Sequence, residues 1–383
     1  MAKKPKFRVG LTVFCSILAL IIGFVAGAGV PFFLKKPVGG DKIPSAGELS
    51  IHVMQLGNHE SGDSIYIKAG DVDILVDGGS NYSSLSTIRT YVDTYVEDGT
   101  LEYVIVTHAD LDHIACFAGA SQTAENLFDY YKCQTIIDFP LTDKTTKAYE
   151  RYVQNRDEEV SSDGAVHYNA LQCYNNEGGA KRVYELAQDI ELEFLYHRYY
   201  EEKHDDENNY SVCFLLRHGE RNFLFTGDLE YDGEMSLKDK NVLPKVEFFK
   251  AGHHGSKTSS NDDLLDVIQP KIVAVSCAAS SVKYLTTGTQ NLHNTFPTQA
   301  FLDRVAKHTT QVYVTTLAEY AMDAESGRYK DTGEWSMLNG HIVVTLGKGE
   351  VSVSCSNNNT PIKDTDWMRV ERDMPTSWQA VAA

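Results

Sequence analysis

The order of apolar and polar residues along the chain predicts short strands interspersed with helices. Apolar runs of about four to eight residues predict strands, which lie early in the chain at residues 50–54, 64–68, 73–76 and 101–106. Later strands are predicted at residues 190–196, 211–218, 221–227, 246–252, 270–277, 311–316, 340–346 and 350–355. Helices are predicted at residues 84–97, 183–187, 261–268 and 297–308. This mixture predicts an α/β sandwich of two sheets with helices outside.

The beginning of the chain has a different pattern. Basic residues precede an uncharged run from Val9 to Leu34, which is longer than the roughly 20 residues that a helix needs to cross a membrane. We expect residues 1–36 to be an uncleaved signal anchor with its N-terminus in the cytoplasm, and residues 37–47 to be a tether. Cleavage near Ala28 is the alternative. Both interpretations predict a body outside the cytoplasmic membrane, with a domain at 48–358 and a loosely packed tail at 359–383.

Composition and charge restrict the class of protein. The chain is 42% hydrophobic and 23% charged, which is typical of globular proteins. Its formal charge is −18, and subtracting the six positive charges of residues 1–36 leaves −24 for the remainder. Such a surface repels polyanions at long range. Nucleic acid therefore stays open as a substrate but is disfavoured. An exported position also permits a disulfide between Cys133 and Cys173, which the sequence does not establish.

Four polar segments, each next to a predicted strand, carry candidate chemistry. They are "THADLDH" (107–113), "ENNYS" (207–211), "FTGDLE" (225–230) and "KAGHHGSKTSS" (250–260). A single Thr-Gly-Asp or His-His is more often a turn or a surface pair than a metal site. All four together, in this order, predict a metal site, because loops at one edge of a sheet bring distant segments together.

These motifs resemble those of the ComEC-type branch of the metallo-β-lactamase-fold hydrolases, over about residues 50–355. The resemblance rests on His-x-Asp-x-Asp-His, Asn-Asn-x-Ser, Thr-Gly-Asp and His-His-Gly-Ser, and includes Gly62-Asp63-Ser64 and Asp77-Gly78-Gly79. It implies a metallo-β-lactamase-like αββα sandwich that holds one or two metal ions at the sheet edges. Two departures stand out. Ala115-Cys116 replaces the family's Gly-Gly, and Phe296 replaces a His, with His293 as the nearest substitute.

The resemblance also implies a ligand set for two divalent ions, Zn²⁺ or Mn²⁺. One position has His108, Asp110 and an Asn oxygen, with Asn209 as the candidate, and shares Asp228. The other has Asp112, His113 and Asp228 together with one histidine of the pair His253 and His254, and which of the two is left open. Oxygen ligands in place of nitrogen make the first position harder, which favours Mn²⁺ over Zn²⁺.

The implied chemistry is hydrolysis by a metal-bound hydroxide, with Asp112 and Asp228 as catalytic ligands. A phosphodiester is the favoured substrate, either DNA or an envelope polymer, and Lys257 or His293 would contact or protonate the leaving side. The alternative is a catalytically idle envelope or DNA-uptake binding module that keeps the fold. A flavodiiron-type oxidoreductase is disfavoured, because Asp110 stands where such an enzyme needs Glu.

Overall fold

A computed structural model describes residues 49–285, 290–347 and 349–379, whose strands form two eight-stranded sheets. The first sheet has the order β16-β15-β1-β2-β3-β4-β5-β6. Its strands are β1 (Leu49–Val53), β2 (Ile65–Ala69), β3 (Val72–Val76), β4 (Thr100–Ile105), β5 (Lys132–Asp138), β6 (Val166–Asn169), β15 (Ile342–Leu346) and β16 (Val351–Cys355). Strands β3 to β6 are parallel and the other pairs are antiparallel.

The second sheet has the order β14-β13-β12-β11-β10-β9-β8-β7. Its strands are β7 (Val183–Ala187), β8 (Ile190–Phe194), β9 (Phe214–His218), β10 (Arg221–Phe225), β11 (Phe248–Lys250), β12 (Ile272–Ala279), β13 (Gln311–Asp323) and β14 (Arg328–Met337). Strands β10 to β13 are parallel. Each sheet therefore has a group of parallel strands, and three of the four predicted motifs lie at the carboxyl ends of β4, β10 and β11. The fourth, residues 207–211, precedes the antiparallel strand β9.

Alternation along the strands builds two layers of core. Phe223 and Phe225 of β10 belong to the apolar cluster that includes Val104 of the first sheet. Leu224, between them, belongs to the cluster that includes Leu265 and Phe301 of the helices. One face of the second sheet thus packs toward the first sheet and the other is covered by helices, which confirms the predicted two-sheet sandwich.

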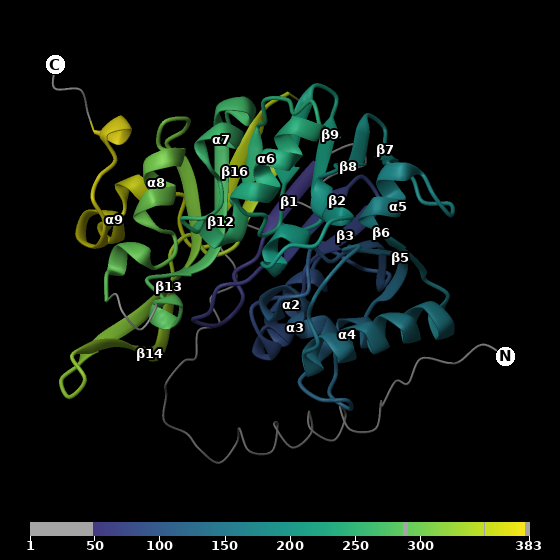
Figure 1. Ribbon diagram of the computed structural model, residues 1–383, viewed down its shortest axis with the longest axis horizontal. Coiled ribbons are helices and arrows are strands. Elements are labelled where there is room, and N and C mark those ends of the chain that lie inside the picture. Colours follow the sequence, from purple (N-terminus) through teal and green to yellow (C-terminus); the bar gives the residue numbers. More distant parts are fainter. Residues whose placement is uncertain (1–48, 286–289, 348, 380–383) are drawn as a thin grey trace, which may run out of the picture. The chain divides into compact units, whose positions relative to one another are not determined.

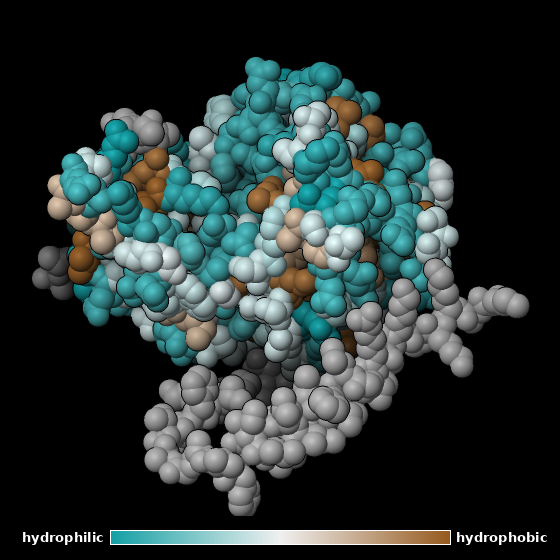
Figure 2. Space-filling model, turned by 90° about the horizontal axis from the view of Figure 1, so that it is seen from below, coloured by the Kyte–Doolittle hydropathy of each residue, from teal (hydrophilic) through white to brown (hydrophobic). Residues whose placement is uncertain are grey.

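The helices cover the outer faces (Figure 1). In Figure 1, α2, α3 and α4 lie together, away from α6, α7 and α8. The helices are α2 (Leu85–Val92), α3 (Leu111–Ala118), α4 (Lys147–Glu158), α5 (Ala170–Asn175), α6 (Tyr231–Lys240), α7 (Asp262–Ile268), α8 (Gln299–Val305) and α9 (Asp366–Glu371). The face seen in Figure 2 is mostly hydrophilic with small apolar patches, as expected for outer surfaces of helices and loops.

One predicted helix is wrong. Residues 183–187 form strand β7, which pairs antiparallel with β8. Tyr184 and Leu186 are buried, while Val183 and Glu185 are exposed. Burial of every second residue is the period of a strand, and five residues are too few to distinguish this period from that of a helix.

The C-terminal segment also differs from the expectation of a loosely packed tail. Ile362, Trp367 and Met368 are buried in the helix-side cluster of the second sheet. The Trp367 indole donates a hydrogen bond of 2.7 Å to the Ser280 hydroxyl, and the Arg372 guanidinium lies 4.4 Å from the centre of the Trp367 ring. Three large apolar side chains spaced irregularly over short helices leave no clear period in the sequence, yet they extend the packed domain beyond residue 358.

Two further expectations concern the N-terminus and the cysteines. The predicted signal anchor and tether lie outside the described residues. Among the helices that are described, none combines the length and apolar character needed to cross a membrane. Cys133 and Cys173 are both buried and free, so the structure does not contain the disulfide that the sequence left open.

Candidate metal centre

The first part of the site is the loop that joins β4 to α3. It begins where β4 leaves the sheet beside β3, and both strands end at the same edge because they are parallel. Thr107 donates to the Asp77 carboxylate from its backbone nitrogen (2.8 Å) and from its hydroxyl (2.9 Å). This bracing fixes the direction of the loop, so that His108 and His113 both enter the space between the sheets, where both are buried.

The second sheet supplies the opposing side chains. Asp228 follows β10 and His254 follows the parallel strand β11. The Asp228 backbone nitrogen donates to the Ser211 hydroxyl at 3.0 Å, and Gly227 before it has φ +52°, which a glycine tolerates best. Asp228 and His254 are buried. The two sheet edges thus present buried polar side chains to one another.

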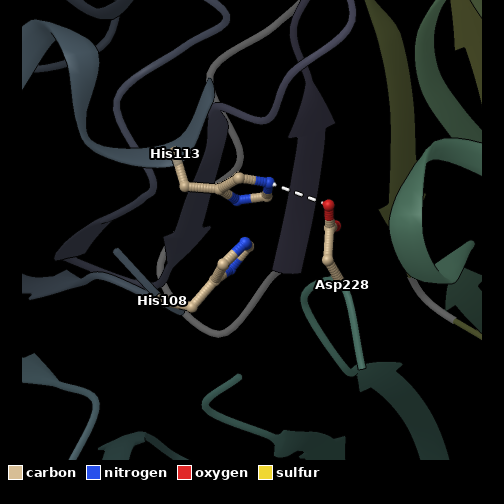
Figure 3. Close-up of side chains that lie close together, drawn as sticks. All are labelled: His108, His113 and Asp228. Carbon is tan, nitrogen blue, oxygen red and sulfur yellow. Dashed lines mark ion pairs between the residues drawn. The ribbon is translucent and has the colours of Figure 1, made fainter. Parts of the chain in front are cut away.

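These side chains converge on Asp228. One carboxylate oxygen of Asp228 lies 3.1 Å from Nε2 of His113 and 3.1 Å from Nε2 of His254. A carboxylate oxygen of Asp112 lies 3.5 Å from the same His254 nitrogen. Figure 3 shows His108 and His113 side by side, both facing Asp228. We call the five residues His108, Asp112, His113, Asp228 and His254 the histidine–carboxylate cluster.

The cluster fits a divalent metal ion. Nε2 of His108, His113 and His254 and Oδ1 of Asp228 are buried without a hydrogen-bond partner in the described part of the chain, although buried polar atoms are nearly always satisfied. Ligand atoms of His108, His113 and Asp228 lie within 4.8 Å of one another, and so do those of Asp112, His113 and His254. Imidazole nitrogens and carboxylate oxygens in this arrangement are the donor set of one or two transition-metal ions.

In two histidines of the cluster, the ring nitrogen Nδ1 contacts another group of the protein. Nδ1 of His113 lies 2.8 Å from the Asp77 carboxylate, and Nδ1 of His254 lies 2.9 Å from the Ser276 carbonyl. Such contacts orient a ring and leave Nε2 free to bind metal. The tertiary structure therefore presents these Nε2 atoms to the interior of the cluster.

The electrostatics of the cluster favour a cation. Burial alone lowers the pKa of His113 and of His254, but the Asp228 carboxylate outweighs it, together with Asp77 at His113 and Asp63 at His254, and raises both pKa values well above the usual range. Burial likewise raises the pKa of Asp228, and the two histidines reverse this shift and lower it. A divalent cation supplies the positive charge that these carboxylates stabilise on the histidines.

The structure distinguishes the two adjacent histidines. His254 belongs to the cluster, whereas Nδ1 of His253 lies 3.0 Å from the Glu230 carboxylate. His253 lines a cavity of about 270 Å³ together with Lys257, Tyr284 and Phe296. Both histidines have positive φ, +43° and +53°, and this turn directs the two rings to different places. The Phe296 ring lies 5.6 Å from the His253 ring and forms a wall of the cavity.

Four other predicted site residues lie outside the cluster. The Asp110 carboxylate pairs with the Lys144 ammonium group, and its other oxygen is 3.7 Å from Nε2 of His108. The Asn209 side-chain oxygen accepts a hydrogen bond of 2.9 Å from the Gly233 backbone, which connects it to α6, and its role as a ligand stays a prediction. His293 lies 4.0 Å from Asp373 and does not line the cavity beside His253, whereas Lys257 does.

A buried ion pair behind His254 was missed by the sequence reasoning. The Lys250 ammonium group, which is 1% exposed, lies 2.7 Å from the Asp63 carboxylate. The other Asp63 oxygen is 3.4 Å from Nδ1 of His254. The signal in the sequence is Gly62-Asp63-Ser64, which belongs to the family pattern but carries no predicted role. Asp63 and Lys250 support the side of the cluster that His254 forms.

Comparisons with known proteins agree with this geometry. Residues 57–126 and 202–279 match the family model of the Metallo-beta-lactamase superfamily. The chain is 28% identical over 186 residues to ComE operon protein 3 of Bacillus subtilis (strain 168), covering 47% of this chain and 20% of that protein. It is 38% identical over 106 residues to competence protein ComA of Neisseria gonorrhoeae, covering 27% of this chain and 15% of that protein.

A similar solved structure is the metallo-beta-lactamase fold protein YhfI from Bacillus subtilis, with a TM-score of 0.39 and 12% identity, covering 74% of this chain and 99% of that one. The chain spans a fifth or less of the length of the two curated relatives. Two segments of the chain thus match the metallo-β-lactamase superfamily, and the curated relatives to which the chain is similar are of the ComEC type, as the motifs indicated.

Proposed function

We propose that this protein is a metal-dependent hydrolase of phosphodiester bonds. It is anchored in the cell membrane by residues 1–36, and its catalytic domain lies outside the cytoplasm. The family model supports hydrolase chemistry in general. The observation that carries the proposal is the convergence of three buried imidazole nitrogens around the Asp228 carboxylate, which lies 3.1 Å from two of them. None of the three has a hydrogen-bond partner in the described part of the chain. A fold that only bound a partner would gain no stability from burying these polar atoms without hydrogen bonds.

Two metal positions are proposed within the cluster. His113, His254 and Asp112 would hold one ion, and His108 would hold the other, with the Asp228 carboxylate shared between them. Divalent ions at such a pair of positions lower the pKa of a water molecule and offset the negative charge of a phosphodiester transition state. Asp77 and the Ser276 carbonyl orient His113 and His254. Whether the ions are Zn²⁺ or Mn²⁺ stays a prediction.

The cavity beside His253 combines groups that suit an anionic substrate with one carboxylate, that of Glu230, which pairs with His253 and accepts a hydrogen bond from the Thr258 hydroxyl. It is lined by the Lys257 side chain and by the hydroxyl-bearing residues Ser256 and Thr258, which suit phosphate oxygens. The stacked rings of Tyr284 and Phe296, 4.9 Å apart, supply an apolar wall. A local cation is needed because the formal charge of the chain is −18, which repels a polyanion at a distance. Of the two predicted residues, Lys257 rather than His293 would therefore contact the leaving side.

The test is hydrolysis by the full chain after chelation and refilling with Mn²⁺ or Zn²⁺. The substrates are bis-p-nitrophenyl phosphate, single- and double-stranded DNA, and a teichoic acid. We expect metal-dependent hydrolysis of at least one phosphodiester, and a loss of about 10²-fold or more in the Asp228→Asn variant. Bound metal with no hydrolysis of any of these substrates would reject the proposal in favour of a binding module.

A further inference from the structure

Lys144 places a positive charge at the edge of the histidine–carboxylate cluster. It lies between β5 and α4, and its ammonium group pairs with one oxygen of the Asp110 carboxylate. The other oxygen of Asp110 is 3.7 Å from the unpartnered Nε2 of His108. The Lys144 ammonium group thus contacts one oxygen of the Asp110 carboxylate, and the other oxygen lies beside the His108 nitrogen that is proposed to bind metal.

The segment that carries Lys144 is held in place by Glu207. The Glu207 carboxylate accepts hydrogen bonds from the Thr142 hydroxyl (2.6 Å), the Asp143 backbone (3.3 Å) and the Ala109 backbone (3.3 Å). The Lys144 backbone nitrogen donates to the Thr142 hydroxyl at 3.0 Å. Because Ala109 is next to His108 and Asp110, one carboxylate ties the Lys144 segment to the loop that carries them. The position of Lys144 is therefore built into the fold.

The Lys144 ammonium group is held against Asp110 in a partly enclosed position, where its side chain is 30% exposed. A permanent ammonium group beside Asp110 weakens the binding of a second cation there in two ways. It takes one carboxylate oxygen, and it repels the metal ion.

We propose that Lys144 competes with the metal ion at the position of His108, which the Asp110 carboxylate adjoins. This makes the two metal positions of the cluster unequal. The position of Asp112, His113 and His254 fills first, and the position at His108 fills fully only when the ammonium group leaves Asp110. The inference rests on the metal centre of the proposed function and adds an order of loading to it.

The experiment measures metal binding by the full chain after chelation, by calorimetric titration with Mn²⁺ and by metal analysis after dialysis. We expect two affinities in the parent protein. In Lys144→Met the weaker affinity should rise by about tenfold or more, which corresponds to about 1.4 kcal/mol, and the tighter affinity should stay unchanged. Lys144→Arg keeps the charge and should behave like the parent.

A matched control is available three residues further along. Lys147 carries the same charge, is 83% exposed and pairs with Glu150 away from the cluster. Lys147→Met should therefore leave both affinities unchanged. The proposal is wrong if Lys144→Met binds both ions like the parent, or if Lys147→Met causes the same increase. Hydrolysis is measured separately, so a protein that shows this loading order without activity would contradict only the proposed function.

Discussion

Asp228 is the residue on which the cluster depends, since its carboxylate faces both His113 and His254 at 3.1 Å. Asp110, by contrast, is paired with Lys144 at the edge of the cluster. Both aspartates lie in predicted metal motifs of the sequence, but their surroundings in the structure differ. One is enclosed by two imidazoles, and the other is partly exposed.

This difference predicts unequal effects on metal binding. We expect Asp228→Asn to lose most of the bound metal, because an amide oxygen is a weaker ligand and the change removes the shared charge of both positions. Asp110→Asn should retain the ion held by Asp112, His113 and His254. Metal analysis after dialysis checks this. Equal metal content in the Asp228 variant and the parent would show that Asp228 is only a turn residue.

The Lys250–Asp63 pair predicts a large effect on stability. Lys250→Met leaves the buried Asp63 carboxylate without its cation, and we expect the free energy of unfolding to fall by about 3–5 kcal/mol. The double variant Lys250→Met/Asp63→Asn removes both charges and should recover part of this loss. Urea unfolding monitored by circular dichroism measures both. A single variant as stable as the parent would mean that water or another cation satisfies Asp63.

At the scale of elements, α9 shows how a short helix joins the core. Trp367 and Met368 are buried under the second sheet's helical layer, while Val370 on the same helix is 78% exposed. The neighbouring Arg372 donates to the Pro297 carbonyl and so connects α9 to the segment that carries Phe296. The C-terminal residues thus support the wall of the cavity beside His253.

Two alanine variants of α9 form a matched pair. Trp367→Ala should lower the free energy of unfolding by about 3–5 kcal/mol, because it removes a buried ring and leaves a cavity. Val370→Ala changes an exposed side chain and should shift the free energy of unfolding by less than about 0.5 kcal/mol. Thermal or urea unfolding of the two proteins checks the difference. Similar stabilities would show that α9 is not part of the cooperative core.

At the scale of the whole molecule, the position relative to the membrane stays a prediction, because residues 1–48 lie outside the described part. Protease added to intact cells should digest the domain if it lies outside the cytoplasm, whereas a cytoplasmic marker protein should remain intact. Detection of the chain with an antibody to its C-terminal part measures this. Complete protection of the domain would place it in the cytoplasm and contradict the export hypothesis.

The sequence by itself determined the two-sheet sandwich and most members of the cluster. Strand-period apolar runs such as residues 221–227 specify which face is buried, and His108, Asp112 and His113 lie within one short motif that follows such a run. Motifs at strand ends meet because parallel strands share an edge. Asp228 lies in a motif at the end of such a run, and the resemblance of the four motifs to the family pattern implies its role as a ligand.

Only the tertiary structure decided features that depend on partners distant in sequence or on backbone direction. The turn at residues 253–254 selects His254 for the cluster, because two adjacent side chains point apart there. Lys144 meets Asp110, and Lys250 meets Asp63, through packing of separate elements. Asn209 accepts a hydrogen bond from Gly233. Trp367 is buried by tertiary contacts, and the local sequence pattern does not predict this burial. A local pattern encodes the period of an element, whereas these contacts arise only when the two sheets and their helices assemble.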